Sequence, residues 1–309
     1  MDRLAKIFVA GHRGMVGSAI VRELERQGYA NIITRTHQEL DLCRQEAVES
    51  FFAQEKPEYV FLAAANAGCT ISNQDVRADF LYDNVEIAVN VIRSAIINKC
   101  HHLVFIASSF VYPHIMDRAL TEDDIFSAKI EKANEPYALS KLVGIKYCEY
   151  ANEQYGMDYK VVIPPNLYGP NDTYDPGKSH VLAALIHRFH NAMKNNLPTV
   201  TCWGNGSALR DFLYVDDLAT LCIQIIDLPN VERILNAGTG RLTSIKALTE
   251  IVAQTVGYSG EIHWDTTKPN GLPRIQLDVT KAENTGWSHC TSLEKGVRLA
   301  YADYLKKYT

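Results

Sequence analysis

The sequence predicts an α/β fold in which a doubly wound parallel sheet is joined to a smaller mixed α/β domain. Three observations predict it. Short apolar runs alternate with helical periodicity over the first half of the chain, a glycine-rich turn follows the first run, and the pattern changes after residue 166. Runs that are apolar on both faces are typical of buried parallel strands. The 309 residues suffice for two domains that share a cleft.

Strands and helices are expected to alternate from the N-terminus. We expect strands at 6–10, 32–34, 59–64, 103–107 and 160–163, and helices at 15–27, 45–54, 79–99 and 136–155. Residues 168–180 are rich in Gly, Pro, Asn and Asp, which predicts a long functional loop. Further on we expect a helix at 181–196, a strand at 200–203, a return through 212–228 and mixed structure over 242–309. The cofactor domain is predicted to comprise 1–165 plus about 212–236, and the substrate domain about 166–211 plus 237–309.

Composition argues against several classes of protein. The net charge of −5 gives no broad electrostatic reason to bind nucleic acid or an anionic membrane. Seven cysteines are scattered without C-x-x-C or Cys/His ligand spacing, so we expect neither a disulfide framework nor a metal site. The chain shows no secretory signal and no apolar run long enough to span a bilayer. We therefore expect a cytoplasmic protein.

A glycine loop of the form G-x-x-G-x-x-G, Gly11-His12-Arg13-Gly14-Met15-Val16-Gly17, joins the first strand to the first helix. Glycines permit a tight turn and close approach of a pyrophosphate, whose charge the helix N-terminus favours. The alternative is that these glycines only pack the helix on the strand. Arg13 and Arg35 are candidates to bind a 2′-phosphate, with His37 as a weaker contact, unless they are simply solvated. Since no acidic residue ends the second strand, we expect NADP rather than NAD.

The third feature is Tyr137-Ala-Leu-Ser-Lys141, whose i,i+4 spacing places both side chains on one face of a helix. A nearby lysine and an oxidised nicotinamide would favour the tyrosine anion and so lower its pKa from about 10. Ser108 ends a predicted strand and can hydrogen-bond the same carbonyl. The Tyr/Lys spacing alone is common in ordinary amphipathic helices. Glycine loop, serine and Tyr/Lys in this order predict ketone–alcohol hydride chemistry.

With these motifs the chain resembles the GDP-L-fucose synthase family of extended short-chain dehydrogenases/reductases. The resemblance rests on AGHRGMVGSAI (10–20), ASSFVYP (107–113), NEPYALSK (134–141), PNLYGPND (165–172), SHV (179–181), WGNG (203–206), LRDFLYVDD (209–217) and GLPR (271–274). It implies an NADPH-dependent epimerase/reductase of nucleotide-sugar biosynthesis that acts on GDP-4-keto-6-deoxy-mannose. It also implies a homodimer formed through helices such as 79–99 and 136–155.

The resemblance assigns roles to individual residues. The implied catalytic residues are Ser108, Tyr137, Lys141 and His180. The implied cofactor contacts are Gly11, Arg13, Gly14, Met15, Val16, Gly17, Arg35, Asp41, Leu42, Ala63, Ala64, Ala65, Ile106, Ala107, Lys141, Pro164, Asn166, Leu167 and His180. The implied GDP-sugar contacts are Ser109, Phe110, Asn166, Arg188, Trp203 and Arg210. Without the resemblance, Arg188 reads as a solvated helix residue and Trp203 as a core aromatic.

One departure from the family bears on the reaction. The family inverts C3 and C5 beside the C4 ketone with a cysteine two residues after the catalytic serine and a histidine, and then reduces the ketone. Here the histidine is His180, but the cysteine position is Phe110, and a phenyl ring cannot exchange a proton. We therefore hypothesise a C4-reductase for a GDP-4-keto-6-deoxy hexose or heptose whose 3,5-epimerase activity is lost or greatly weakened. His180 then has either an acid/base or a positioning role.

Other interpretations stay open. The chain could be a complete GDP-L-fucose synthase that uses another base such as Cys69, although Cys69 could equally be a buried, inert thiol. A non-catalytic NADP-sensing protein is the alternative from another class. A 4,6-dehydratase is disfavoured, because no acidic pair follows the serine. His37 and Asn270 stand where similar chains tend to carry arginine and aspartate, which weakens the prediction of strict NADP use and of one sugar or base contact.

Overall fold

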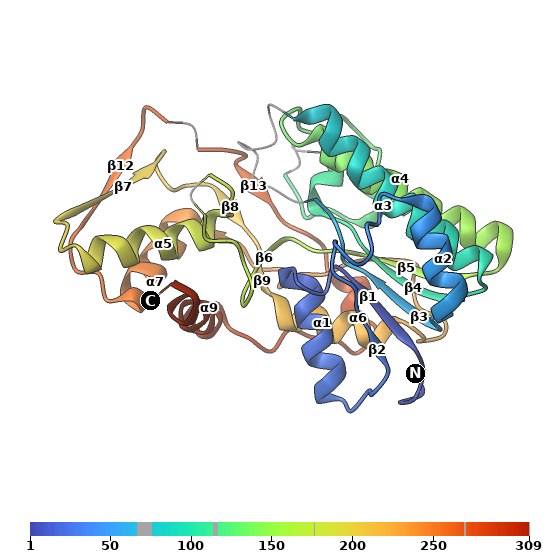
Figure 1. Ribbon diagram of the computed structural model, residues 1–309. Coiled ribbons are helices and arrows are strands. Elements are labelled where there is room, and N and C mark those ends of the chain that lie inside the picture. The colour runs from blue at the N-terminus through green and yellow to red at the C-terminus, as the bar shows by residue number, and fades with distance from the viewer. Residues whose placement is uncertain (67–75, 114–116, 176, 269, 309) are drawn as a thin grey trace.

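The structure, a computed structural model, describes residues 1–66, 76–113, 117–175, 177–268 and 270–308. A six-stranded parallel sheet forms one end of the molecule (Figure 1). Its strands, in spatial order, are β2 (Ile32–Ile33), β1 (Ile7–Ala10), β3 (Tyr59–Leu62), β4 (His102–Ile106), β5 (Asp158–Ile163) and β10 (Ile234–Asn236). The chain leaves β1 for β2 on one side and then crosses to β3 on the other. The carboxyl ends of β1 and β3 therefore flank a switch point, where such sheets bind ligands.

Helices cover both faces of this sheet (Figure 1). One face carries α1 (Met15–Arg26) and α6 (Val215–Ile225), and the other carries α2 (Gln45–Glu55), α3 (Arg77–Ile97) and α4 (Glu135–Tyr155). The two hydrophobic cores follow from the two-residue period of a strand. Along β1, Ile7 and Val9 join the core beneath α1 and α6, whereas Phe8 and Ala10 join the core beneath α2, α3 and α4. The predicted doubly wound parallel sheet is confirmed.

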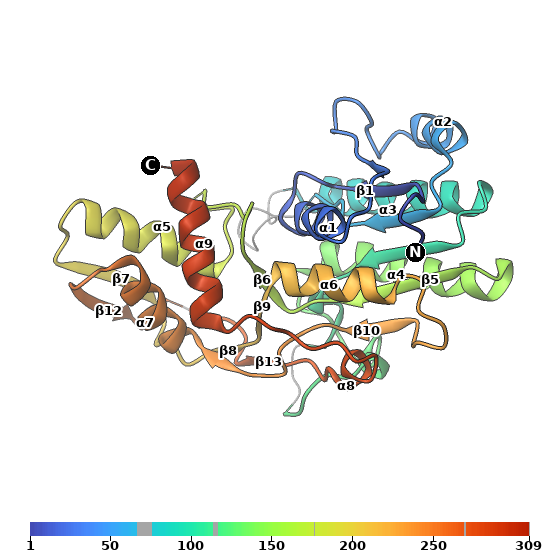
Figure 2. The ribbon, with the colours of Figure 1, turned by 90° about the horizontal axis from the view of Figure 1, so that it is seen from below.

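A third core lies in the second half of the chain. It is built mainly from α5 (Val181–Lys194), α7 (Ile245–Val256), α9 (Leu293–Tyr308) and the parallel pair β7 (Thr199–Trp203) and β12 (Glu261–Asp265). Two small sheets lie between this core and the large sheet (Figure 2): β6 (Asn166–Tyr168) with β9 (Phe212–Tyr214), and β11 (Thr243–Ser244), β8 (Leu209–Arg210) and β13 (Arg274–Ile275). After β13, α8 (Thr280–Glu283) returns to the large sheet. The division of the chain into two domains stays a proposal.

Some elements differ from the sequence-based expectation. β10 completes the large sheet, although residues 234–236 were expected only as part of a return. β6 occupies residues 166–168, where we expected the chain to enter a loop. Two- and three-residue strands are too short to show a periodic pattern, and only their partners on distant segments define them. No helix within the described ranges is both long and apolar enough to cross a membrane.

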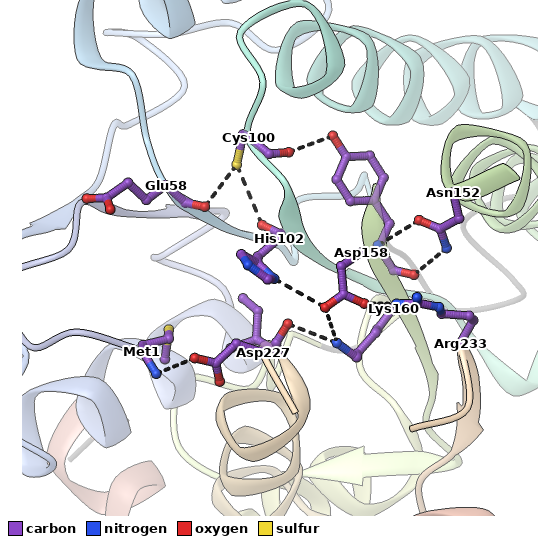
Figure 3. Close-up of polar contacts among 11 residues, drawn as sticks. Met1, Glu58, Cys100, His102, Asn152, Asp158, Lys160, Asp227 and Arg233 are labelled. Carbon is purple, nitrogen blue, oxygen red and sulfur yellow. Dashed lines mark hydrogen bonds and ion pairs between the residues drawn. The ribbon is translucent and has the colours of Figure 1, made fainter. Parts of the chain in front are cut away.

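The amino ends of the parallel strands carry a polar cluster (Figure 3). The fully buried Lys160 of β5 donates from Nζ to Asp158 Oδ2 at 2.9 Å and to the Ile226 carbonyl at 3.0 Å. Asp158 also pairs with Arg233, and the terminal amine of Met1 pairs with Asp227. This cluster lies at the edge of the sheet opposite the carboxyl ends, so it is remote from the cavities described next.

Candidate active site

The glycine loop and the ends of β1 and β3 enclose a cavity of about 430 Å³. Gly11 has a left-handed φ of +84°, and a Cβ there would lie 2.7 Å from the Ala64 backbone. A Cβ on Gly17 would lie 2.2 Å from the Gly11 carbonyl oxygen. Glycine is therefore required where helix, loop and strand approach one another. The residues of the predicted cofactor site that line this cavity are Gly11, Gly14, Arg35, Asp41, Leu42, Ala63, Ala64 and Ala65. The cradle fits a dinucleotide.

The predicted 2′-phosphate ligands differ in their surroundings. Arg35 lines the cavity, donates from Nη2 to Glu55 Oε1 at 2.6 Å and lies over the Phe51 ring at 5.4 Å from its centroid. His37 also lines the cavity, but 82% of its side chain is exposed. Arg13 is exposed and does not line the cavity. Arg35 is therefore the cation that the fold holds in place beside the cofactor cavity.

A second cavity, of about 240 Å³, brings together the predicted hydride-transfer residues. Tyr137 and Lys141 reach it from one face of α4, with Lys141 Nζ 5.4 Å from the centroid of the Tyr137 ring. Lys141 Nζ donates to the Ile106 carbonyl at 2.8 Å. Ser108, at the end of β4, accepts from the Phe110 N–H at 3.4 Å through its Oγ. The remaining predicted residues that line this cavity are Gly14, Met15, Val16, Ala63, Ala65, Ile106, Ala107, Ser109, Phe110, Pro164, Asn166, Leu167 and His180.

Burial sets the protonation of the Tyr/Lys pair. Desolvation raises the pKa of Tyr137 above its usual value and lowers the pKa of Lys141 to about 7. From the sequence we expected the lysine to lower the tyrosine pKa. In the free protein desolvation has the larger effect on the Tyr137 pKa. Lys141 is itself only 4% exposed, and the same burial disfavours the charged form of its ammonium group. Tyr137 therefore keeps its proton and can donate it to a carbonyl oxygen.

Phe110 and His180 lie where three cavities meet. Both line the cavity with Tyr137, a second of about 470 Å³ and a third of about 820 Å³. The Phe110 ring stands edge-on to the Tyr137 ring with centroids 6.4 Å apart. His180 caps α5, and although part of it is accessible from the cleft, desolvation lowers its pKa below the ordinary value. The junction therefore offers a hydrocarbon ring and a histidine that is neutral at pH 7.

The 470 Å³ cavity contains every residue that we predicted to bind the nucleotide sugar: Ser109, Phe110, Asn166, Arg188, Trp203 and Arg210. Arg188 Nη1 donates to the Thr201 carbonyl at 2.9 Å, and Arg210 Nη1 donates to the Leu209 carbonyl at 2.8 Å. These bonds anchor both guanidinium groups and leave further N–H donors, which suit phosphate oxygens. Trp203 is 54% exposed and is therefore not a core aromatic. Lys268 Nζ lies over its ring at 5.9 Å from the centroid.

Sequence reasoning missed part of this lining. Glu131, Trp264 and Leu272 line the same cavity but belong to segments for which we assigned no site. Asn270 also lines it, and its Oδ1 accepts from the Asn205 N–H at 2.7 Å, so it fixes the turn after Trp203. Trp264 comes next to the β7 segment only because β12 pairs with β7, where its partner is Cys202, and this pairing of distant segments leaves no local signal in the sequence. Cys69 lies outside the described residues.

Comparisons with known proteins agree with this geometry. Residues 7–238 match the family described as NAD dependent epimerase/dehydratase. The chain is 47% identical to GDP-L-fucose synthase 1 of Arabidopsis thaliana over 99% of its length and 94% of that protein. It is 43% identical to GDP-L-fucose synthase of Escherichia coli, with 97% of each covered. It also superposes on a GDP-mannoheptose C4 reductase from Campylobacter jejuni with NADP bound, at a TM-score of 0.90 and 35% identity, with 99% of each chain covered.

The match to the family model covers most of the chain, and the identities extend beyond it to nearly the full length. The chain therefore belongs to the NAD-dependent epimerase/dehydratase family of extended short-chain dehydrogenases and is a relative of the GDP-L-fucose synthases.

Proposed function

We propose that this protein is an NADPH-dependent C4-ketoreductase of nucleotide-sugar biosynthesis that acts on a GDP-4-keto-6-deoxy sugar and has lost 3,5-epimerase activity. One observation carries the proposal. The reducing residues Ser108, Tyr137 and Lys141 line one cavity, while the adjoining position 110 is a phenylalanine. The GDP-L-fucose synthases and the GDP-sugar reductase among its relatives support an NADP-dependent, GDP-sugar-modifying enzyme.

NADPH would lie along the two smaller cavities, and when bound it supplies the hydride. The glycine loop would hold its pyrophosphate at the start of α1, and Arg35, which lines the same cavity, would bind the 2′-phosphate. Residues 164–167 and 106–107 line the wall beside the nicotinamide. The Arg35–Glu55 ion pair opposes a second negative charge, so we propose a preference for NADP over NAD rather than strict selection.

The protein's part in the reduction is to hold the ketone and move a proton. Ser108 Oγ and Tyr137 Oη hydrogen-bond the C4 oxygen, and Tyr137 gives its proton to that oxygen as negative charge develops. A protonated Lys141, close to the Tyr137 ring, stabilises the tyrosinate that results. Burial of the pair strengthens this stabilisation, because charges interact more strongly away from water.

Epimerisation at C3 and C5 requires a base on one face of each carbon and an acid on the other. His180 could serve one face, and the aromatic ring of Phe110 can serve neither. We therefore propose that His180 positions the sugar. The 820 Å³ cavity that begins at Phe110 and His180 offers space for a sugar longer than a hexose, so a heptose is within the proposed substrate class.

The alternative is a complete GDP-L-fucose synthase, favoured by identities of 47% and 43% to proteins of that name. Incubation with NADPH and GDP-4-keto-6-deoxy-mannose in heavy water separates the two. NMR of the product should show deuterium at neither C3 nor C5 above an enzyme-free control. Label at both positions would refute the loss of epimerase activity. Binding of NADPH without its oxidation by any nucleotide keto sugar would instead favour the NADP-sensing alternative, which the complete Ser/Tyr/Lys set argues against.

We further propose a cytoplasmic homodimer. α3 and α4 pack side by side, and their outer surface exposes large apolar side chains: Tyr82, Leu139, Val143 and Tyr150. A face of this kind is typical of a helical subunit interface. Sedimentation equilibrium should give twice the chain mass, and Leu139→Glu should shift the protein toward monomer without altering its circular dichroism.

A further inference from the structure

The loop that follows β6 runs between α9 and α1 (Figure 2), and it makes polar contacts with both helices. These contacts centre on Asn171, nine residues before His180. Asn171 Nδ2 donates to Ser18 Oγ of α1 at 2.8 Å. Its backbone N–H donates to Asp303 Oδ2 at 3.0 Å, and its Oδ1 accepts from Lys307 Nζ at 2.7 Å, both in α9. One residue thus joins two helices that belong to different hydrophobic cores.

The loop is fixed on its α9 side. Asp303 and Lys307 pair with each other at 3.0 Å, so both partners of Asn171 are themselves held. Tyr174, three residues later, donates from its hydroxyl to the Ala300 carbonyl at 3.0 Å. Asn171 has a left-handed φ of +66°, a conformation that asparagine tolerates better than most residues. Residues 171–174 are therefore held against α9 by these contacts.

On the α1 side, the contact lies in the turn that begins the helix. Ser18 follows Gly17 directly, and its N–H donates to the Gly14 carbonyl at 2.9 Å. Its Oγ accepts from Arg22 Nη1 at 3.2 Å in addition to Asn171. Gly14 borders both cofactor cavities. A pyrophosphate bound here contacts the same turn that holds Ser18.

We propose that Asn171 is a positioning residue that couples cofactor binding to nucleotide-sugar binding. Ordering the first turn of α1 around the cofactor fixes Ser18, and Ser18 fixes the loop that leads to His180 and α5. Since α5 carries Arg188, binding of the cofactor would order the substrate cavity before the GDP-sugar binds. The GDP-sugar then binds with a smaller loss of conformational entropy. This inference rests on the proposed function, because it takes NADPH and a GDP-sugar as the two ligands.

The test measures GDP binding by calorimetry, with and without saturating NADPH. Wild-type protein should bind GDP at least about fivefold more tightly when NADPH is present, the lower end of typical coupling. Asn171→Gly keeps the backbone free to adopt its φ but removes the side-chain bonds, so it should bring this ratio close to one. Asn230→Gly is the matched control, because Asn230 also has a left-handed φ, +57°, at an exposed site. It should keep the wild-type ratio.

A second variant guards against misfolding of the first. Ser18→Ala removes the contact of Asn171 with α1, together with the Ser18 Oγ bonds to Arg22 and Met15 inside that helix, and leaves Asp303 and Lys307 in place. It should also lower the ratio without lowering the melting temperature of the free protein by more than a few degrees. A wild-type ratio near one, or an unchanged ratio in both Asn171→Gly and Ser18→Ala, overturns the inference. Failure of NADPH or GDP to bind wild-type protein separately would instead refute the proposed function.

Discussion

The buried lysine of the hydride site should make the stability of the free protein depend on pH in a defined direction. Lys141 has a pKa of about 7 in the folded protein and about 10.5 in the unfolded chain. Between these values the unfolded chain binds a proton that the folded protein does not. The free energy of unfolding must therefore rise with pH across this window. Below pH 7 both states are protonated and the destabilisation by the buried charge is complete.

The magnitude follows from the width of the window. Each unit of pKa difference corresponds to about 1.4 kcal/mol, so the gain between pH 7 and pH 9 is about 2–3 kcal/mol. Because Lys141 is 4% exposed, solvent screening reduces this value little. Other groups titrate over the same range, but they do so equally in a Lys141→Met variant. The difference in unfolding free energy between wild type and Lys141→Met isolates the lysine.

Urea denaturation of both proteins at pH 6, 7, 8 and 9 measures that difference. The unfolding free energy of wild type, relative to that of Lys141→Met, should rise with pH above pH 7. It should change little between pH 6 and pH 7. A difference that stays flat up to pH 9 would show that Lys141 remains protonated in the folded protein. The lowered pKa of Lys141 would then be refuted, because a buried ammonium group that keeps its charge needs an opposite charge, and none of the described residues that line the cavity carries a carboxylate.

Three further outcomes follow from the same structure. Tyr137→Phe should lower kcat for ketone reduction by about 10²–10⁴-fold with NADPH affinity unchanged, because it removes only the proton donor. Stopped-flow measurement of NADPH oxidation gives kcat, and a smaller loss would mean that another group donates the proton. Phe110→Cys should introduce deuterium exchange at C3 or C5 in heavy water, since it restores an ionisable group beside His180, whereas Phe110→Ala as control should not. Asp158→Ala should cost about 3 kcal/mol in chemical denaturation with kcat unchanged, because it leaves Lys160 and Arg233 without their carboxylate at the edge remote from the site.

Much of the fold could be predicted because its signals are local. Apolar runs, helical periodicity and the glycine loop each lie within about fifteen residues, and they predict β1, α1 and the turn between them. The Tyr137–Lys141 spacing needs only a helix to bring the two side chains onto one face. Motifs of this kind carry their geometry with them.

The remainder depends on contacts between distant segments. Glu131 and Trp264 reach the substrate cavity from parts of the chain 133 residues apart, and neither lies in a recognisable pattern. The raised pKa of Tyr137 in the free protein, without the nicotinamide, has a related cause. The sequence supplies the neighbouring charge, but the desolvation that outweighs it depends on how tightly α4 and β4 enclose the pair.

Phe110 also bears on the order of chemical events. The acidity of the carbons flanking a ketone lasts only as long as the ketone, and hydride transfer ends it. A reductase with only carbon and hydrogen at this position cannot invert C3 or C5 itself. Once it has reduced the ketone, these carbons are no longer acidic and keep the configuration that they had in the substrate. Any separate catalyst that inverts them must act earlier and compete for the same intermediate. Under the proposed function, the side chain at position 110 determines whether one polypeptide sets the stereochemistry of the sugar or receives a sugar whose stereochemistry another enzyme has set.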